Sequence, residues 1–306
     1  WPEAAWNGIS PLCRRSVPAN LLVRPLFRVH KQRFGARINL LVTSFRMEYQ
    51  VTETNLSSIQ QVERRKGFGM KRWMFVGKSG KRDLLLYLSS VLAASGSKVL
   101  LTDGTENSKY RYSIGDGDSY LPLTEFCGFD VATGTSGFMS AVSMELSNED
   151  PSTDYDYILE DIDTPNGLTP ERLMSADEIV WVTTFDRYEV EVSAGWFRSL
   201  CQHWPELRGL VVRPVFIRTV DSRVNSRYIL GLLEDLPLEW HSEAICIPWD
   251  ESNWAVHLEN EHLQQLRLRR FSRSYKRAVR QLLHELAGWD YSIAKRAVRQ
   301  AERRQA

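Results

Sequence analysis

Apolar runs and amphipathic segments alternate along most of the chain. Short, nearly continuous apolar runs, typical of buried strands, occur at 72–76, 98–103, 155–163, 176–184, 207–216 and 244–250. Segments with helical spacing follow several of them, at 82–96, 189–204 and 226–236. Buried strands that alternate with helices predict an α/β fold, with a largely parallel sheet and helices on both faces.

Ligands of such folds bind beyond the carboxyl ends of the strands. We therefore expect functional residues in the loops that follow the runs ending near residues 76, 102, 162 and 183. The polar stretch 103–120 is predicted to be a loop.

The end of the chain has a different pattern. The spacing at 274–289 predicts a closing amphipathic helix, and 290–306 predicts a short second helix with an Ala-rich apolar face and a basic face. A basic amphipathic helix can lie on an anionic membrane surface or contact nucleic acid. A solvated terminal helix is the alternative.

Charge is distributed unevenly, although the net charge is only +1. Residues 1–69 carry a net +7, residues 70–264 carry −15, and residues 265–306 carry +9. This asymmetry suggests an anionic partner for the basic ends. The four cysteines form no CxxC pair, and no apolar run approaches the roughly 20 residues of a membrane span, which favours a cytoplasmic protein.

Three parts follow from these patterns: a basic extension at 1–69, an α/β domain at 70–287 and a basic helical tail at 288–306. We hypothesise that Met70 is the natural start, because the pattern changes there. The alternative is that 1–69 is a basic arm that contacts a membrane or nucleic acid.

The first strand and the first helix are joined by a Gly-Lys loop, from Gly77 through Lys78, Ser79, Gly80 and Lys81 to Arg82 and Asp83. Glycines let backbone N–H groups surround an anion, the helix N-terminus adds partial positive charge, and a lysine neutralises phosphate oxygens. The loop therefore predicts a phosphate site. The alternative is an ordinary surface turn with solvated lysines.

The order of strand, Gly-Lys loop, helix and acidic strand ends resembles the MinD/ParA family of P-loop ATPases, whose loop reads KGGxGK[ST]. Gly77, Gly80 and Lys81 match this loop, whereas Val76 replaces the family's signature lysine unless Lys78 substitutes for it. Arg82 stands where the family has the hydroxyl that ligates magnesium.

The acidic strand ends also resemble that family. Asp103 matches the first Asp of its DxD motif, and Thr105 replaces the second. The Walker B acid falls on Asp161 when the strand is counted from its start, or on Asp163 when the Asp-Thr-Pro tripeptide is aligned. Arg213 takes the place of a base-contacting Asn. The alternative is that Asp161 and Asp163 are strand-end carboxylates that only cap a turn.

The resemblance implies a cytoplasmic positioning protein that binds ATP or ADP, with weakened magnesium binding, impaired hydrolysis, a homodimer and a protein client. It also implies a peripheral position at the inner face of the membrane. Eroded loops occur in the pilus-assembly (TadZ/CpaE-like) branch, which implies a pilus or secretion machine as the client. An active ATPase for partition or division-site placement, and a scaffold that binds no nucleotide, are the alternatives.

Overall fold

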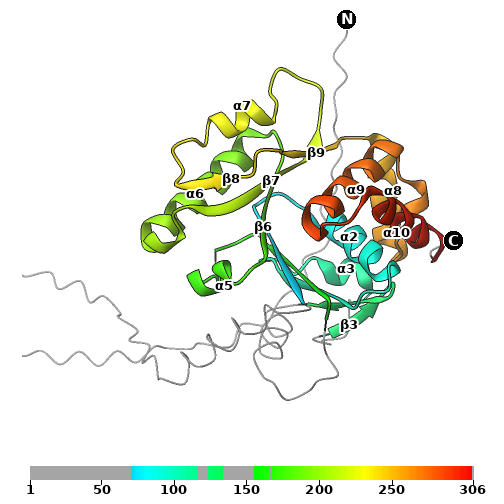
Figure 1. Cartoon of the computed structure of the whole chain (residues 1–306). Helices are drawn as coiled ribbons and strands as arrows, with labels where there is room; N and C mark the ends of the chain where they lie inside the picture. Colours follow the sequence, from blue (N-terminus) through cyan, green and yellow to red (C-terminus); the bar gives the residue numbers. More distant parts are fainter. Residues whose placement is uncertain (1–69, 116–122, 134–154, 166, 305–306) are drawn as a thin grey trace, which may run out of the picture. The chain divides into compact units, whose positions relative to one another are not determined.

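The computed structural model describes residues 70–115, 123–133, 155–165 and 167–304 (Figure 1). The predicted extension 1–69 lies outside the described residues. Within the described ranges, a nine-stranded sheet has the order β3-β4-β2-β5-β1-β6-β7-β8, and β9 pairs with β7 as well. Except for the antiparallel pair β3–β4, the strand pairs described are parallel. This confirms the predicted α/β fold with a largely parallel sheet.

The strands are β1 (Lys71–Val76), β2 (Val99–Gly104), β3 (Leu123–Phe126), β4 (Phe129–Ala132), β5 (Tyr157–Ile162), β6 (Glu178–Thr183), β7 (Leu210–Thr219), β8 (Leu238–Trp240) and β9 (Ile245–Pro248). The helices are α2 (Arg82–Ala94), α3 (Tyr110–Ile114), α5 (Pro170–Met174), α6 (Arg187–His203), α7 (Ser226–Gly231), α8 (Glu251–Leu263), α9 (Arg273–Ala287) and α10 (Tyr291–Arg304). Short 3-10 turns stand at η2 (Pro205–Leu207) and η3 (Leu268–Arg270).

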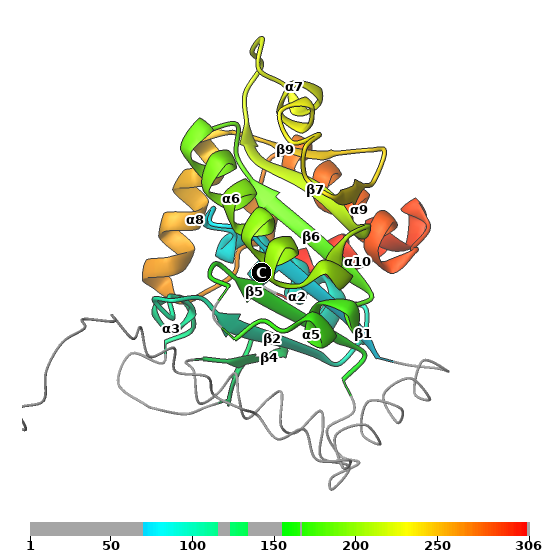
Figure 2. The same ribbon diagram turned by 90° about the vertical axis from the view of Figure 1, so that its left-hand side faces the viewer.

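Helices cover both faces of the sheet. Figure 2 shows α5 and α6 on the near face, with α2, α9 and α10 behind the strands. One hydrophobic core consists of alternate strand residues packed against α2, α9 and α10. The second consists of the strand residues that point to the other face, packed against α5, α6 and α7. The period-2 alternation of the strands separates these two cores.

Two features differ from the sequence prediction. The expected loop 103–120 contains helix α3, because Tyr110 and Ile114 are one helical turn apart and both are buried. The helix expected at 226–236 ends early, since α7 spans only Ser226–Gly231.

The basic tail is part of the folded body. Ala294, Ala297, Val298 and Ala301 of α10 are buried, and α10 packs against α2 and α9. Arg304 donates to the carbonyl of Ala93 at 3.1 Å. One hypothesis for this helix was a contact with an anionic membrane through its apolar face. In the structure that face is largely covered by protein, because its small Ala side chains allow close helix packing.

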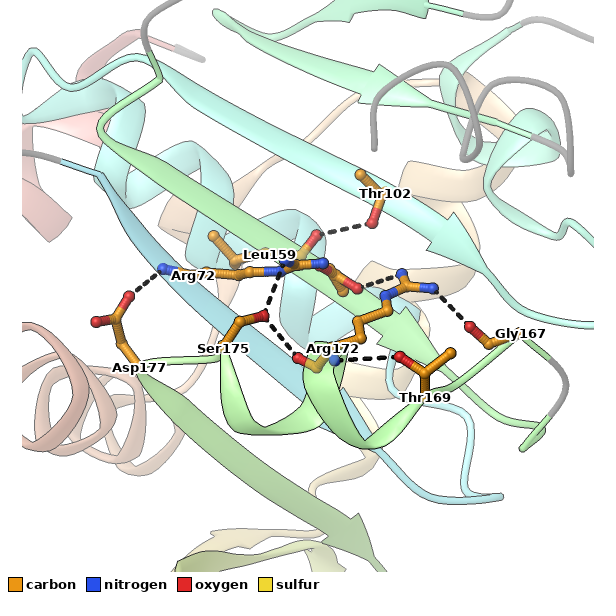
Figure 3. Close-up of polar contacts among 9 residues, drawn as sticks. Arg72, Thr102, Leu159, Gly167, Thr169, Arg172, Ser175 and Asp177 are labelled. Atoms are coloured by element: carbon orange, nitrogen blue, oxygen red, sulfur yellow. Dashed lines mark hydrogen bonds and ion pairs between the residues drawn. The ribbon is translucent and has the colours of Figure 1, made fainter. Parts of the chain in front are cut away.

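A buried polar network fixes strand β5 against its neighbours. Glu160, 1% exposed, accepts one hydrogen bond from Arg72 of β1 and one from Arg172 of α5, each at 2.5 Å. Figure 3 shows how Ser175 and Thr169 hold the two arginines in place. Arg172 also donates to the carbonyl of Gly167 at 3.1 Å. The network thereby fixes both the strand and the segment that follows it.

Glu160→Ala should lower the free energy of unfolding by about 3 kcal/mol, because it leaves two buried guanidinium groups without their shared carboxylate. Urea denaturation at neutral pH measures the change. Glu243→Ala, at an exposed glutamate, is the matched control and should stay within about 0.5 kcal/mol of the wild type. A similar small loss in both variants would contradict the prediction.

Candidate functional site

The loop between β1 and α2 turns at Gly77, a position that requires glycine. Gly77 has a φ of +135°, and a Cβ added there would lie 2.3 Å from the carbonyl oxygen of Val182. Only glycine fits this position. Its N–H donates to the carbonyl of Ile162 at 3.1 Å, which joins the loop to the end of β5. The N-terminus of the 13-residue helix α2 follows at once.

Lys81 is buried in this loop, with 2% of its surface exposed. Its Nζ lies 2.6 Å from Oδ1 of Asp161 and donates to the carbonyls of Gly77 at 2.9 Å and Ile162 at 3.2 Å. The ammonium group thus has three oxygen partners. It is the buried cation of the loop, not a solvated surface lysine.

Asp161 has a second partner on its other oxygen. The hydroxyl of Tyr110, from α3, donates to Oδ2 of Asp161 at 2.7 Å. Burial, together with the adjacent Asp161 carboxylate, raises the pKa of Tyr110 well above its usual value, so the phenol stays protonated. Asp161 therefore lies between one cation and one neutral donor.

Asp103 lies beside this group at the end of β2. Its Oδ1 accepts from the backbone and hydroxyl of Thr105, at 3.0 and 2.5 Å, and its Oδ2 accepts from the Tyr110 N–H at 3.2 Å. Burial raises the pKa of Asp103 to about 6, and the nearby charge of Asp161 adds to the rise, although the hydrogen bonds to Thr105 and Tyr110 partly oppose it. The structure thus brings together Lys81, Asp161 and Asp103.

Asp163 has a different environment. It is partly exposed, and its Oδ1 accepts the backbone N–H of Glu106 at 2.8 Å. Of the two predicted acids, Asp161 is the one in contact with the loop lysine. Asp163 instead ties the loop after β2 to the loop after β5.

The remaining loop side chains point to other elements. Ser79 donates to Glu189 of α6 at 2.5 Å. Lys78 lies 3.5 Å from the carboxylate of Glu106 and 3.5 Å from the carbonyl of Asp163. These contacts hold the loop between α6 and the loop after β5.

Arg82 and Asp83 face α8. Arg82 donates to Glu261 at 2.8 Å and to the carbonyl of Lys109 at 3.1 Å. Asp83 lies 3.6 Å from Nδ1 of His257. In this structure the arginine that replaces the family's hydroxyl is therefore held by a carboxylate of α8.

A cavity of about 50 Å³ adjoins the loop at the carboxyl ends of β7 and β9. Its lining includes Gly80 and Lys81 of the loop, together with Arg218, Trp249 and Trp254. It shares three residues, Gly80, Lys81 and Asp83, with the Gly-Lys loop, so the cavity and the loop are contiguous.

Arg213, which the resemblance aligned with a base-contacting Asn, is not among the residues that line the cavity. This residue is buried in the middle of β7, where its guanidinium pairs with Glu178 at 3.3 Å and Glu285 at 3.0 Å. β7 continues to Thr219, so Arg218, not Arg213, reaches the cavity.

No protein-family model and no curated protein matches the sequence. Solved structures do resemble the fold. The MinC:MinD cell division protein complex of Aquifex aeolicus is 13% identical, covers 72% of this chain and 97% of its own, and has a TM-score of 0.51. The MinD cell division protein of the same organism is 14% identical, covers 72% of this chain and 98% of its own, and has a TM-score of 0.50.

The chain has the MinD/ParA-type P-loop fold. This confirms the fold that the resemblance implied. In this MinD-like fold, the loop after β1, the end of β2 and the end of β5 meet at one edge of the sheet, where Lys81, Asp103 and Asp161 lie.

Three residues of the site were missed by sequence reasoning. Glu189 follows Asp186, whose side chain accepts its N–H and caps α6, so the local pattern indicated only a helix start. Tyr110 lay in a segment predicted to be a loop, and Arg218 lay in a strand predicted to end earlier. The signal for a helix there was the spacing of Tyr110 and Ile114, two apolar side chains one helical turn apart.

The described ranges contain no group of three His, Cys, Asp or Glu side chains that could hold a metal ion. Among the helices of these ranges, none combines the length and apolar character that crossing a bilayer requires.

Asp103→Asn should change the pH dependence of stability. The folded pKa of Asp103, about 6, lies above the unfolded value of 3.8. Its stabilising contribution is therefore complete below about pH 4 and is lost as the pH rises through about 6. The free energy of unfolding of the variant, relative to wild type, should rise by about 2 kcal/mol from pH 4 to pH 7. Denaturation curves at both values measure this, and a difference independent of pH would contradict it.

Proposed function

We propose that this chain binds the phosphates of a nucleoside di- or triphosphate in the loop Gly77–Lys81, and that it hydrolyses them poorly or not at all. The observation that carries the proposal is Lys81, buried in the loop that turns at Gly77 and paired with Asp161. An incoming phosphate replaces the carboxylate as the partner of the ammonium group. The N-terminus of α2 adds partial positive charge at the same place.

The exchange leaves Asp161 with a partner. When Lys81 turns to phosphate, the hydroxyl of Tyr110 still donates to Asp161. A buried carboxylate left without any donor costs several kcal/mol. Tyr110 therefore lowers the cost of releasing the lysine.

The residues do not fit a magnesium ion. The loop hydroxyl that holds magnesium in P-loop enzymes is replaced by Arg82, and the guanidinium of Arg82 lies on Glu261. Both oxygens of Asp161 already have partners. Thr105, which replaces the second acid of the DxD motif, donates its hydroxyl to Asp103. Impaired hydrolysis follows, because phosphoryl transfer depends on metal and positioned charge.

We further propose a role in placing a larger assembly, as a homodimer or with a protein client. The MinD-like fold supports this, since one similar structure is a complex of MinD with MinC. A pilus or secretion machine as the client stays a prediction from the resemblance. With the Ala face of α10 buried, a contact with an anionic surface would use the exposed basic side chains of that helix, such as Lys295, Arg296 and Arg299.

Lys81→Met combined with Asp161→Asn should abolish binding of ADP and GDP while the protein stays folded. The pair removes both buried charges together, which avoids leaving one of them unpaired. Isothermal titration measures binding, and circular dichroism checks the fold. The matched control is Lys98→Ala at an exposed lysine, which should bind as the wild type does. Wild-type affinity in the double variant would refute the phosphate site.

Nucleotide affinity should change less than about threefold between magnesium and EDTA, because the loop lacks its metal hydroxyl. Arg82→Thr restores that hydroxyl and should make binding magnesium-dependent. Arg82→Ala, which removes the guanidinium without adding a hydroxyl, is the control and should stay insensitive to the metal. Strong magnesium dependence with steady phosphate release in the wild type would overturn impaired hydrolysis.

A further inference from the structure

A second cavity is lined by residues of the Gly-Lys loop, of the segment after β5 and of α6. Its volume is about 210 Å³, well above the roughly 10–15 Å³ that one water molecule needs. Lys78 belongs to it from the loop and Pro165 from the segment after β5. Neither Lys81 nor Asp161 lines it, so this cavity is separate from the proposed phosphate site.

Two hydrogen-bond donors of α6 line this cavity without a partner. Ser193 is 1% exposed, and neither its Oγ nor the indole Nε1 of Trp196 has a hydrogen-bond partner among the described residues. Ser79, which is equally buried, donates to Glu189 instead. A buried donor without an acceptor costs free energy. The O–H of Ser193 and the N–H of Trp196 are therefore ready to donate to an acceptor in the cavity.

Lys78 adds a loosely held cation to the same lining. Its side chain is 38% exposed, and its Nζ lies 3.5 Å from the carboxylate of Glu106 and 3.5 Å from the carbonyl of Asp163. The buried Lys81, by contrast, has its carboxylate partner at 2.6 Å. Both contacts of Lys78 are longer than an ordinary N–H···O hydrogen bond. A better-placed acceptor in the cavity can therefore take their place.

The rest of the lining limits the charge and shape of an occupant. The carboxylate of Asp163 also lines the cavity, and its Oδ1 accepts the backbone N–H of Glu106 at 2.8 Å. This negative charge disfavours a doubly charged anion such as phosphate. Val192 and Pro165 present apolar surface. The lining therefore suits a molecule with one negative charge and a short apolar stem.

A carboxylate meets these conditions, because it has about four acceptor sites on two oxygens and no donor. It accepts from Ser193, Trp196 and Lys78 together, and hydrogen bonds between a cation and a carboxylate are stronger than neutral ones. A neutral amide brings an NH₂ group, which these three donors cannot satisfy. We propose that this cavity binds a short-chain carboxylic acid, with its apolar stem against Val192 and Pro165.

The test is titration of the nitrogen-15-labelled full chain with sodium butyrate, at constant ionic strength and without nucleotide. The indole N–H resonance of Trp196 is followed by NMR, and Trp196→Phe identifies it by removing one indole signal. Butyrate should shift this resonance in a saturable way, whereas butyramide, which has the same shape and no charge, should not. An unmoved resonance at high millimolar butyrate, as expected if water alone fills the cavity, would overturn the site. An equal shift with butyramide would also overturn it.

Variants of the lining make the test sharper. Ser193→Ala and Lys78→Met should each weaken butyrate binding by about tenfold, the loss expected for one hydrogen bond to a charged group. Ser199→Ala, at an exposed serine of the same helix, is the matched control and should bind as the wild type does. Wild-type affinity in Ser193→Ala would overturn the proposed contacts. Binding of a capped glutamate in place of butyrate would assign the cavity to a protein side chain and overturn the small acid. The readout needs no nucleotide, so it is independent of the proposed phosphate site.

Discussion

The site depends on a single buried ion pair, between Lys81 in the loop after β1 and Asp161 at the end of β5. Both side chains are almost wholly buried, so each charge needs a partner that compensates for its lost hydration. The pair joins the phosphate loop to the central strand of the sheet. It also fixes where the loop backbone lies, because the same ammonium group binds the carbonyls of Gly77 and Ile162.

The surrounding residues are arranged around this pair. Glu160, the neighbour of Asp161, points to the opposite face of β5 and binds two arginines, which anchors the strand. Tyr110 reaches Asp161 from α3, and its backbone binds Asp103. The chain therefore keeps the lysine and acid that the resemblance identified, while Thr105 and Arg82 stand where the resembling family has an acid and a hydroxyl. The proposed function, holding phosphate without cleaving it, rests on these two replacements.

The fold was predictable because the buried strands correspond to continuous apolar runs, and the long helices show apolar residues at helical spacing. The alternation in β5 did not decide between Asp161 and Asp163, because both are an even number of residues from Tyr157 and Leu159. What separates them is the end of the strand, since β5 includes Asp161 and ends at Ile162, before Asp163. The full length of β7 was not predictable, because its predicted run ended at residue 216, whereas the strand continues to Thr219, which pairs with Pro248 of β9 after a shift in register. The burial of Arg213 was not predictable either, because its partners, Glu178 and Glu285, come from distant elements. The positions of Tyr110 and Arg218 at the site could not be predicted for the same reason, because only tertiary contacts bring them there.

The most direct test of the account is a crystal structure of the full chain with a bound nucleoside diphosphate. The account predicts that Nζ of Lys81 leaves Asp161 and lies within hydrogen-bond distance of the β-phosphate, while the hydroxyl of Tyr110 stays on Asp161. A structure in which the lysine still pairs with Asp161, with the phosphates bound elsewhere, would contradict it.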